Sequence, residues 1–300
     1  MPGPLRTEFA RIGRDRTSGA AELALRAVTA VERWLWRHKN PTEAEVEELA
    51  VRLLKVQPSM APLLRLANEV ALAADSGHPG AALSRATKDF RRRLEGAPRR
   101  IAKLFAAELE GEDPWPSAIF SYSSTVVAAV ASARRRISSV LTSECRPGME
   151  GLLSVAKLSK AGVQVRLATD AGLLSLLQGS RVVVVGADAV LSHAFVNKIG
   201  TRVLYLRARE AGCPMWVLTD STKLLPEAIA APFWRPSDGP PGDVWPRPTR
   251  RVQVVNPLFE HTELGDDLRV LTEAGWLDAG QVRDAVEGIR ISPRMKRLAD

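Results

Sequence analysis

The sequence predicts an α/β protein in which a helical domain, residues 1–112, precedes a parallel-sheet domain, residues 113–300. The first hundred residues place apolar side chains at helical spacing and show no strand pattern. Beyond a turn-rich linker at 111–116, short apolar runs alternate with helical segments, which is typical of a parallel sheet with right-handed crossovers. The four consecutive valines at 182–185 predict a strand that is buried on both faces.

Caps and breaks define the helices of the first domain. A helix is predicted over 20–35, with Thr17 or Ser18 as its N-cap. Thr42 and Glu45 match a capping box that opens a second helix, which ends near Val56. Further helices are predicted over 60–75, 81–94 and 99–109, and the breaks between them fall at glycine and proline.

The second domain is predicted from alternating strands and helices. The expected strands lie over 118–120, 138–141, 163–168, 182–185, 215–218 and 252–255. The expected crossover helices lie over 126–136, 149–160, 173–178 and 201–211. The proline-rich segment 231–250 is expected to be an irregular packed loop.

Polar residues follow the predicted strands where each strand ends. Because the carboxyl ends of parallel strands meet at one edge of a sheet, Asp188, Arg146, Lys198 and Lys223 should converge on one crevice. The cations among them favour a phosphorylated polar metabolite as the ligand. The alternative is that these side chains only cap helices and turns, as they do in many α/β proteins.

The net charge of +8 raises the question of a nucleic-acid partner. The densest basic patch lies at 91–103, but no aromatic stacking platform is interleaved with its arginines. We therefore expect a surface that attracts small anions, and no nucleic-acid partner. GxGxxG, GxxxxGK[ST] and GxSxG motifs are absent, which argues against a dinucleotide site, a P-loop and a serine hydrolase.

Cysteine usage and hydropathy exclude further classes. Two cysteines and four histidines show no metal-ligand spacing, so we expect neither a metal nor a cofactor. No apolar run reaches the roughly 18 to 20 residues of a membrane span, and the N-terminus lacks a signal-peptide core. The expectation is a cytoplasmic protein without a membrane partner.

Four segments carry a resemblance to a known family. They are VVVVGADAVL with VNKIGT, SECRPGMEG, TDSTKLLP and VNPLFEHT. In their order and spacing along the chain they resemble the translation initiation factor 2B alpha/beta/delta family, whose superfamily includes ribose-1,5-bisphosphate and methylthioribose-1-phosphate isomerases. The resemblance implies an N-terminal helical domain followed by a Rossmann-like domain, and a homodimer formed through the latter.

The resemblance also implies a candidate catalytic pair. In the isomerases, a cysteine after the first sheet strand and an aspartate after the GAD strand move protons between sugar carbons. Asp188 matches the aspartate, whereas Ser123 stands at the cysteine position. A serine hydroxyl without an activating histidine is too weak a base for this step, which argues against isomerase activity. Cys145, beside Arg146, could supply an ionised thiol instead; the alternative is a small buried cysteine.

A phosphate site follows from the same resemblance. The implied ligand-binding residues are Ser18, Gly19, Ala20, Gln57, Ser124, Arg146, Asn197, Lys198 and Lys223. The isomerases usually carry arginine where this chain has Ser18 and Gln57, which removes two forked donors. The predicted function is a factor 2B-like protein that binds a pentose phosphate or an AMP-like nucleotide. The alternatives are an aldose-ketose isomerase with Asp188 as acid and base, a non-catalytic assembly subunit, and a nucleic-acid binder.

Overall fold

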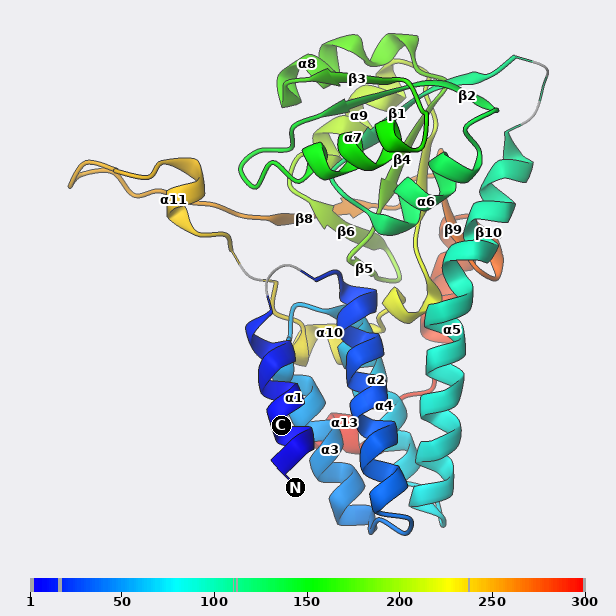
Figure 1. Cartoon of the computed structure of the whole chain (residues 1–300), viewed down its shortest axis with the longest axis vertical. Helices are drawn as coiled ribbons and strands as arrows, with labels where there is room; N and C mark the ends of the chain where they lie inside the picture. Colours follow the sequence, from blue (N-terminus) through cyan, green and yellow to red (C-terminus); the bar gives the residue numbers. More distant parts are fainter. Residues whose placement is uncertain (1–2, 16–17, 110, 112, 237, 299–300) are drawn as a thin grey trace.

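The computed structural model describes residues 3–15, 18–109, 111, 113–236 and 238–298. The N-terminal part is an elongated helical bundle (Figure 1). Its helices are α1 (Gly3–Arg14), α2 (Ala20–Arg37), α3 (Glu43–Val56), α4 (Ala61–Ala74) and α5 (Pro79–Glu108). The predicted capping box of α3 is confirmed, since Thr42 and Glu45 exchange both of its hydrogen bonds. The N-cap of α2 is Gly19, so the prediction of Ser18 is wrong, and Thr17 lies outside the described residues.

Helix α5 runs without interruption through Pro98, so the predicted break between 94 and 99 is wrong. Proline inside a helix costs about 3 kcal/mol because it removes one backbone hydrogen bond and crowds the preceding turn. Leu94, Ala97 and Ile101 on either side of it are buried on one face. This burial keeps the helix continuous and offsets the local cost.

The C-terminal part contains a seven-stranded sheet in the order β10-β9-β7-β4-β1-β2-β3. Its strands are β1 (Trp115–Phe120), β2 (Ile137–Ser143), β3 (Val165–Ala168), β4 (Val182–Gly186), β7 (Met215–Leu218), β9 (Leu268–Thr272) and β10 (Gly275–Leu277). All neighbouring pairs are parallel except β9 with β10. The predicted mostly parallel α/β sheet is thereby confirmed.

Helices cover both faces of this sheet. Buried side chains of α5, α6 (Ser124–Ser132) and α7 (Gly151–Lys160) pack on one face. Those of α8 (Asp170–Leu176), α9 (Thr201–Glu210) and α12 (Ala279–Glu287) pack on the other. The shorter helical segments are η1 (Leu177–Gly179), η2 (Ser221–Lys223), α10 (Glu227–Phe233), α11 (Pro241–Val244) and α13 (Pro293–Arg297).

The strand predicted over 252–255 is wrong. Val252 and Val255 lie in an irregular segment and are exposed, while β9 occupies the edge of β7 where a further parallel strand would pair. The chain instead forms a small antiparallel sheet that the sequence did not predict. Its strands are β5 (Ala189–Val190), β6 (Ala194–Lys198) and β8 (Phe259–Glu263).

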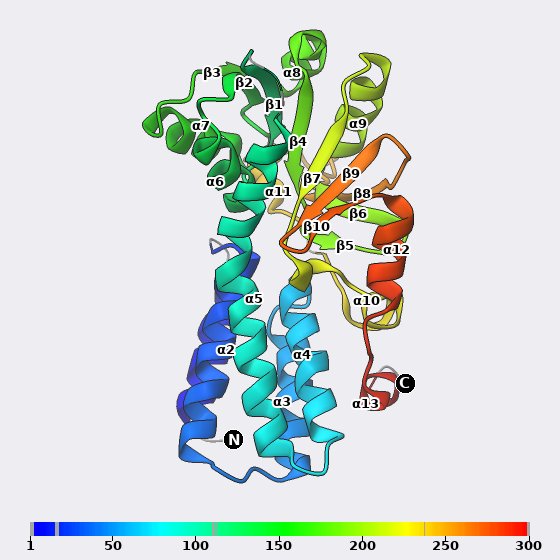
Figure 2. The same cartoon turned by 90° about the vertical axis from the view of Figure 1, so that its right-hand side faces the viewer.

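The two parts of the chain are joined by shared packing. Phe90, near the middle of α5, belongs to the core of the bundle, whereas Phe105 packs against the sheet. Figure 2 shows α5 running from the bundle to the sheet. Ala189 and Val196 of the small sheet are also buried in the bundle core. The small sheet therefore sits at the junction of the two parts, and the domain boundary at residue 112 stays a prediction.

Candidate functional site

Side chains from the segments after β1, β2, β4 and β7 of the large sheet meet the last residue of β6, which belongs to the small sheet. Asp188 lies directly between β4 and β5, and its N–H donates to the carbonyl of Val196 on β6 at 2.8 Å. Lys223 of η2, which follows β7, donates from Nζ to the carbonyl of Ala187 at 2.7 Å. Lys198 ends β6 and is buried. The structure thus brings Asp188, Lys198 and Lys223 together from separate strand ends.

A second carboxylate completes this cluster. Glu150, in the loop before α7, pairs with Lys198 at 2.6 Å between Oε1 and Nζ. The hydroxyl of Ser121, directly after β1, donates to the same carboxylate oxygen at 3.2 Å. Glu150 and Ser121 are not among the predicted site residues. Glu150 lies within the SECRPGMEG segment after a strand end, which is the signal that could have revealed it.

The environment of Asp188 favours its protonated form. Burial raises the pKa of Asp188, Lys223 opposes this shift, the negative charge of Glu150 adds to it, and Lys198 again opposes it. Because burial dominates, the pKa of Asp188 lies above its ordinary value. A carboxylate whose pKa is raised is a stronger base toward a ligand than an ordinary aspartate.

Ser123 serves the local structure of the loop after β1. It is the N-cap of α6, and its Oγ accepts from the N–H of Val126. It also packs against Gly186 at the end of β4, because a Cβ at that glycine would lie 2.7 Å from the Ser123 Oγ. Ser123 is therefore a neighbour of the strand that leads to Asp188. Ser124, the first residue of α6, is exposed.

The loop after β2 is fixed by the carboxylate of Asp170, the first residue of α8. Asp170 accepts from the backbone N–H of Cys145 at 3.0 Å and from that of Arg146 at 2.8 Å. The Arg146 guanidinium is turned outward and donates to the carbonyl of Asp243 at 2.9 Å. No contact in the described residues joins the Arg146 side chain to Asp188 or to the two lysines.

Cys145 does not have the environment of an ionised thiol. Its side chain is fully buried, and burial raises its pKa to about 11, although hydrogen bonds from Ser143 and from the N–H of Ser121 oppose the shift. The hypothesis of a thiolate activated by Arg146 is therefore wrong, because desolvation raises the pKa of the thiol and the Arg146 guanidinium is turned away toward Asp243.

Three residues in these two loops have left-handed backbone conformations. The φ angles are 66° at Ser121, 61° at Cys145 and 59° at Met149. Non-glycine residues adopt this conformation at a cost of about 1 to 3 kcal/mol, and such residues concentrate at functional sites. Met149 directly precedes Glu150 in the chain. Ser121 donates hydrogen bonds to Glu150 and to the Cys145 sulfur, so the three strained residues lie at or next to the cluster of charged side chains.

The remaining predicted ligand residues make structural contacts. Gln57 is buried and donates to the carbonyls of Ile12 and Asp15, where it holds the end of α1. Ser18 bonds to Asp15 and to Glu22. Asn197 donates to the Thr201 hydroxyl at 3.1 Å.

The predicted loop Ser18-Gly19-Ala20 lies at the end of α2 that faces the sheet part (Figure 1). The described residues show no contact between it and Asp188. The two carboxylates at Ser18, those of Asp15 and Glu22, do not favour a phosphate there.

Known proteins are similar in sequence to this chain over most of its length. The sequence model of the Initiation factor 2 subunit family matches residues 16–278. A Pyrococcus horikoshii protein named putative translation initiation factor eIF-2B subunit 2-like is 30% identical over 220 residues, 71% of this chain and 76% of that protein. A ribose 1,5-bisphosphate isomerase of Archaeoglobus fulgidus is 26% identical over 266 residues, 86% of this chain and 84% of the isomerase.

A solved structure shows the same arrangement. The crystal structure of a Pyrococcus horikoshii OT3 protein described as translation initiation factor eIF-2B superposes with a TM-score of 0.74 at 26% identity. The match covers 92% of this chain and 98% of that chain.

Proposed function

Because the chain belongs to the initiation factor 2 subunit family, we propose that it binds a sugar phosphate or nucleotide phosphate at the cluster of Asp188, Lys198 and Lys223. A pentose phosphate or an AMP-like nucleotide is the expected ligand. The observation that supports this proposal most is the meeting of two lysines from different strand ends beside a carboxyl group whose pKa is raised.

The hydrogen-bonding capacity of the cluster suits a phosphate. An ammonium group has three donors, and the described contacts of the Lys223 Nζ use one of them, on the carbonyl of Ala187. Asp188 in its protonated form would donate a further hydrogen bond to a ligand oxygen. Lys198 would have to exchange Glu150 for the ligand, so the affinity is set by competition between two anions for one lysine.

A second candidate function is an aldose-ketose isomerase. The raised pKa of Asp188 favours it, since a carboxylate becomes a stronger base when its pKa rises. The reaction needs a second group to move a proton at the adjacent carbon. Ser123 is engaged as a helix cap, and the thiol of Cys145 is buried with a pKa of about 11. Phosphate binding is therefore our first candidate function, and isomerisation is the second.

Calorimetric titration tests the binding proposal. Ribose 1,5-bisphosphate and AMP are titrated into the protein, into Lys223→Met and into a control, Lys160→Met, whose lysine is exposed on α7. We expect a dissociation constant of about 1 to 100 μM for one ligand, weakened at least about tenfold in Lys223→Met only. Equal affinity in all three proteins would contradict the proposal.

The isomerase alternative is separated by following ribose 1,5-bisphosphate with NMR. The binding proposal expects no ribulose product. Product that forms with the wild type and disappears with Asp188→Asn would establish the second candidate in its place.

We also propose the assembly and the location implied by the family resemblance, a cytoplasmic homodimer formed through the sheet part. Sedimentation equilibrium would measure the mass of the assembly, and a monomer at micromolar concentration would contradict this point. Within the described residues, no helix has the length and apolar character needed to cross a membrane.

A further inference from the structure

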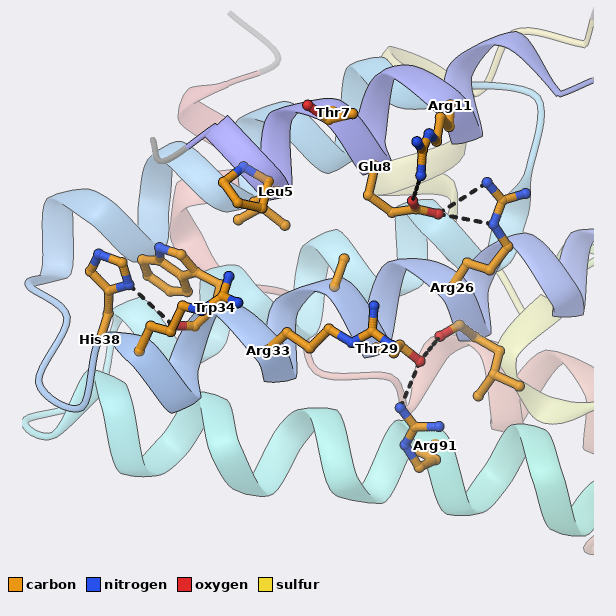
Figure 3. Close-up of a pocket in the computed structure, with 14 residues that line it drawn as sticks. Leu5, Thr7, Glu8, Arg11, Arg26, Thr29, Arg33, Trp34, His38 and Arg91 are labelled. Atoms are coloured by element: carbon orange, nitrogen blue, oxygen red, sulfur yellow. Dashed lines mark hydrogen bonds and ion pairs between the residues drawn. The ribbon is translucent and has the colours of Figure 1, made fainter.

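A cavity of about 700 Å³ lies in the helical bundle between α1, α2 and α5, away from the cluster at the strand ends (Figure 3). Leu5 of α1 and Leu25 and Ala30 of α2 form part of its apolar lining. The volume is in the range of ligand pockets, which are mostly apolar with a few placed polar groups. Sequence patterning gave no indication of it, because its walls come from separate helices.

Trp34 of α2 gives this cavity an unused hydrogen-bond donor. The side chain is 5% exposed, and its Nε1 has no hydrogen-bond partner in the described part of the chain. The indole stacks on His38 with 5.3 Å between ring centroids, and its nitrogen points toward α1 in Figure 3. A buried donor without an acceptor destabilises the folded state, and a ligand oxygen in the cavity would satisfy it.

The charged residues of the lining are mostly arginines, and two of these form no ion pair within the described part of the chain. Arg26 is held by Glu8 and Asp15, and Arg91 by Glu32 and Glu95. Arg11 also approaches Glu8, at 3.6 Å.

The remaining two arginines of the lining flank Trp34 in the chain. Arg33 and Arg37 are exposed, line the cavity and make no ion pair with any described residue. They stand four positions apart on α2, so both residues lie on the same face of the helix, one turn from each other. An anion between them would meet two forked donors.

We propose that this cavity binds a small organic anion, whose apolar body packs on Leu5, Leu25 and Trp34 and whose carboxylate or phosphate is held by Arg33 and Arg37. The indole N–H of Trp34 donates to an oxygen of the same ligand. The site is separate from the cluster at Asp188 and does not depend on the function proposed there.

Titration with 8-anilinonaphthalene-1-sulfonate tests the proposal, because this fluorescent probe joins an aromatic body to an anionic group. We expect saturable binding that weakens at least about tenfold in the double variant Arg33→Gln/Arg37→Gln. The matched control is Arg85→Gln/Arg100→Gln, which removes the same charge from exposed positions of α5 and should bind as the wild type does. Trp34→Phe keeps the aromatic packing and should weaken binding by about two- to tenfold.

The probe also distinguishes the two sites and the two kinds of anion. Lys223→Met should leave probe binding unchanged. Displacement by decanoate would identify a carboxylate ligand, and displacement by phenyl phosphate a phosphate ligand. Equal affinity in the arginine double variant and its control, loss of binding in Lys223→Met, or failure of both competitors to displace the probe would each overturn the proposal.

Discussion

The Nζ of Lys198 lies 2.6 Å from Oε1 of Glu150, so a carboxylate from the loop after β2 neutralises the lysine that ends β6. Both side chains are more than half buried, and the pair lies beside Asp188 and Lys223. The cluster therefore contains two cations and two carboxyl groups. A phosphate ligand competes with Glu150 for Lys198, which makes the glutamate a determinant of affinity.

Replacement of Glu150 by glutamine should tighten phosphate binding. The variant frees the Lys198 ammonium and removes a negative charge, which should lower the dissociation constant about tenfold, or about 1.4 kcal/mol. Calorimetric titration with the pentose phosphate that binds the wild type measures this. Glu287→Gln, at an exposed position of α12, is the control and should have no effect. Weaker binding in Glu150→Gln would show that the carboxylate supports the ligand.

Replacement of Asp188 by asparagine should stabilise the protein at neutral pH. The folded-state pKa of Asp188 is raised, so its contribution to stability is present below the unfolded pKa of about 4 and is lost as pH rises through the folded pKa. Asparagine avoids the cost of burying the charge. We expect the free energy of unfolding to rise by about 1 kcal/mol at pH 7 and to approach the wild-type value near pH 4.

Urea unfolding at the two pH values measures the gain in the Asp188→Asn protein. Asp266→Asn, at an exposed position, is the control and should change stability little at either pH. A variant less stable than the wild type at pH 7 would contradict this prediction. It would show that the attraction between the Asp188 carboxylate and the two lysines stabilises the fold by more than the burial of the charge destabilises it.

The two cysteines should react slowly in the native protein. Burial raises the pKa of both Cys145 and Cys213 to about 11, so at pH 8 the thiolate fraction is about a hundredfold below that of an ordinary thiol. Titration with a chromogenic disulfide reagent should be slow in buffer and complete in urea. Fast reaction of Cys145 in buffer would restore it as a candidate base.

The same shifts predict a pH dependence of stability. The pKa values of the Cys145 and Cys213 thiols are higher in the folded state than the unfolded value near 9. The two thiols therefore contribute to the free energy of unfolding below pH 9, and this contribution is lost as the pH rises to about 11. Cys145→Ala should therefore reduce the fall in unfolding free energy over this range. An unchanged pH profile in this variant would contradict the assignment.

Two glycine substitutions should have opposite effects on stability. A Cβ at Gly151 would lie 1.9 Å from the carbonyl oxygen of Ser143, so Gly151→Ala should lower the free energy of unfolding by about 3 kcal/mol or more. Gly96 is within α5 with no atom near the Cβ position. Gly96→Ala should stabilise by about 0.4 to 1 kcal/mol. Thermal unfolding compares the two, and a tolerated Gly151→Ala would show that the loop after β2 can move.

Local signals explain which elements the sequence predicted well. The capping box at Thr42 and the buried strand at β4 depend on residues close in the chain, and both are present. Two of the wrong predictions, a break at Pro98 and a strand over 252–255, concern segments in which packing overrides local preference. Pro98 stays helical because its neighbours are buried, and the exposed valines at 252 and 255 have no strand to pair with.

The sequence by itself determined the alternation of β1, β2, β3, β4 and β7 with helices and the placement of Asp188 and Lys223 after strand ends, because hydrophobic periodicity and turn residues act over short distances. The tertiary structure alone decided that Glu150 neutralises Lys198, that Cys145 is buried with a raised pKa, and that α1, α2 and α5 enclose a cavity. These features depend on the distances between residues that are far apart in the chain. Such distances fix the desolvation and the charge that each group experiences, and neither can be read from composition or spacing.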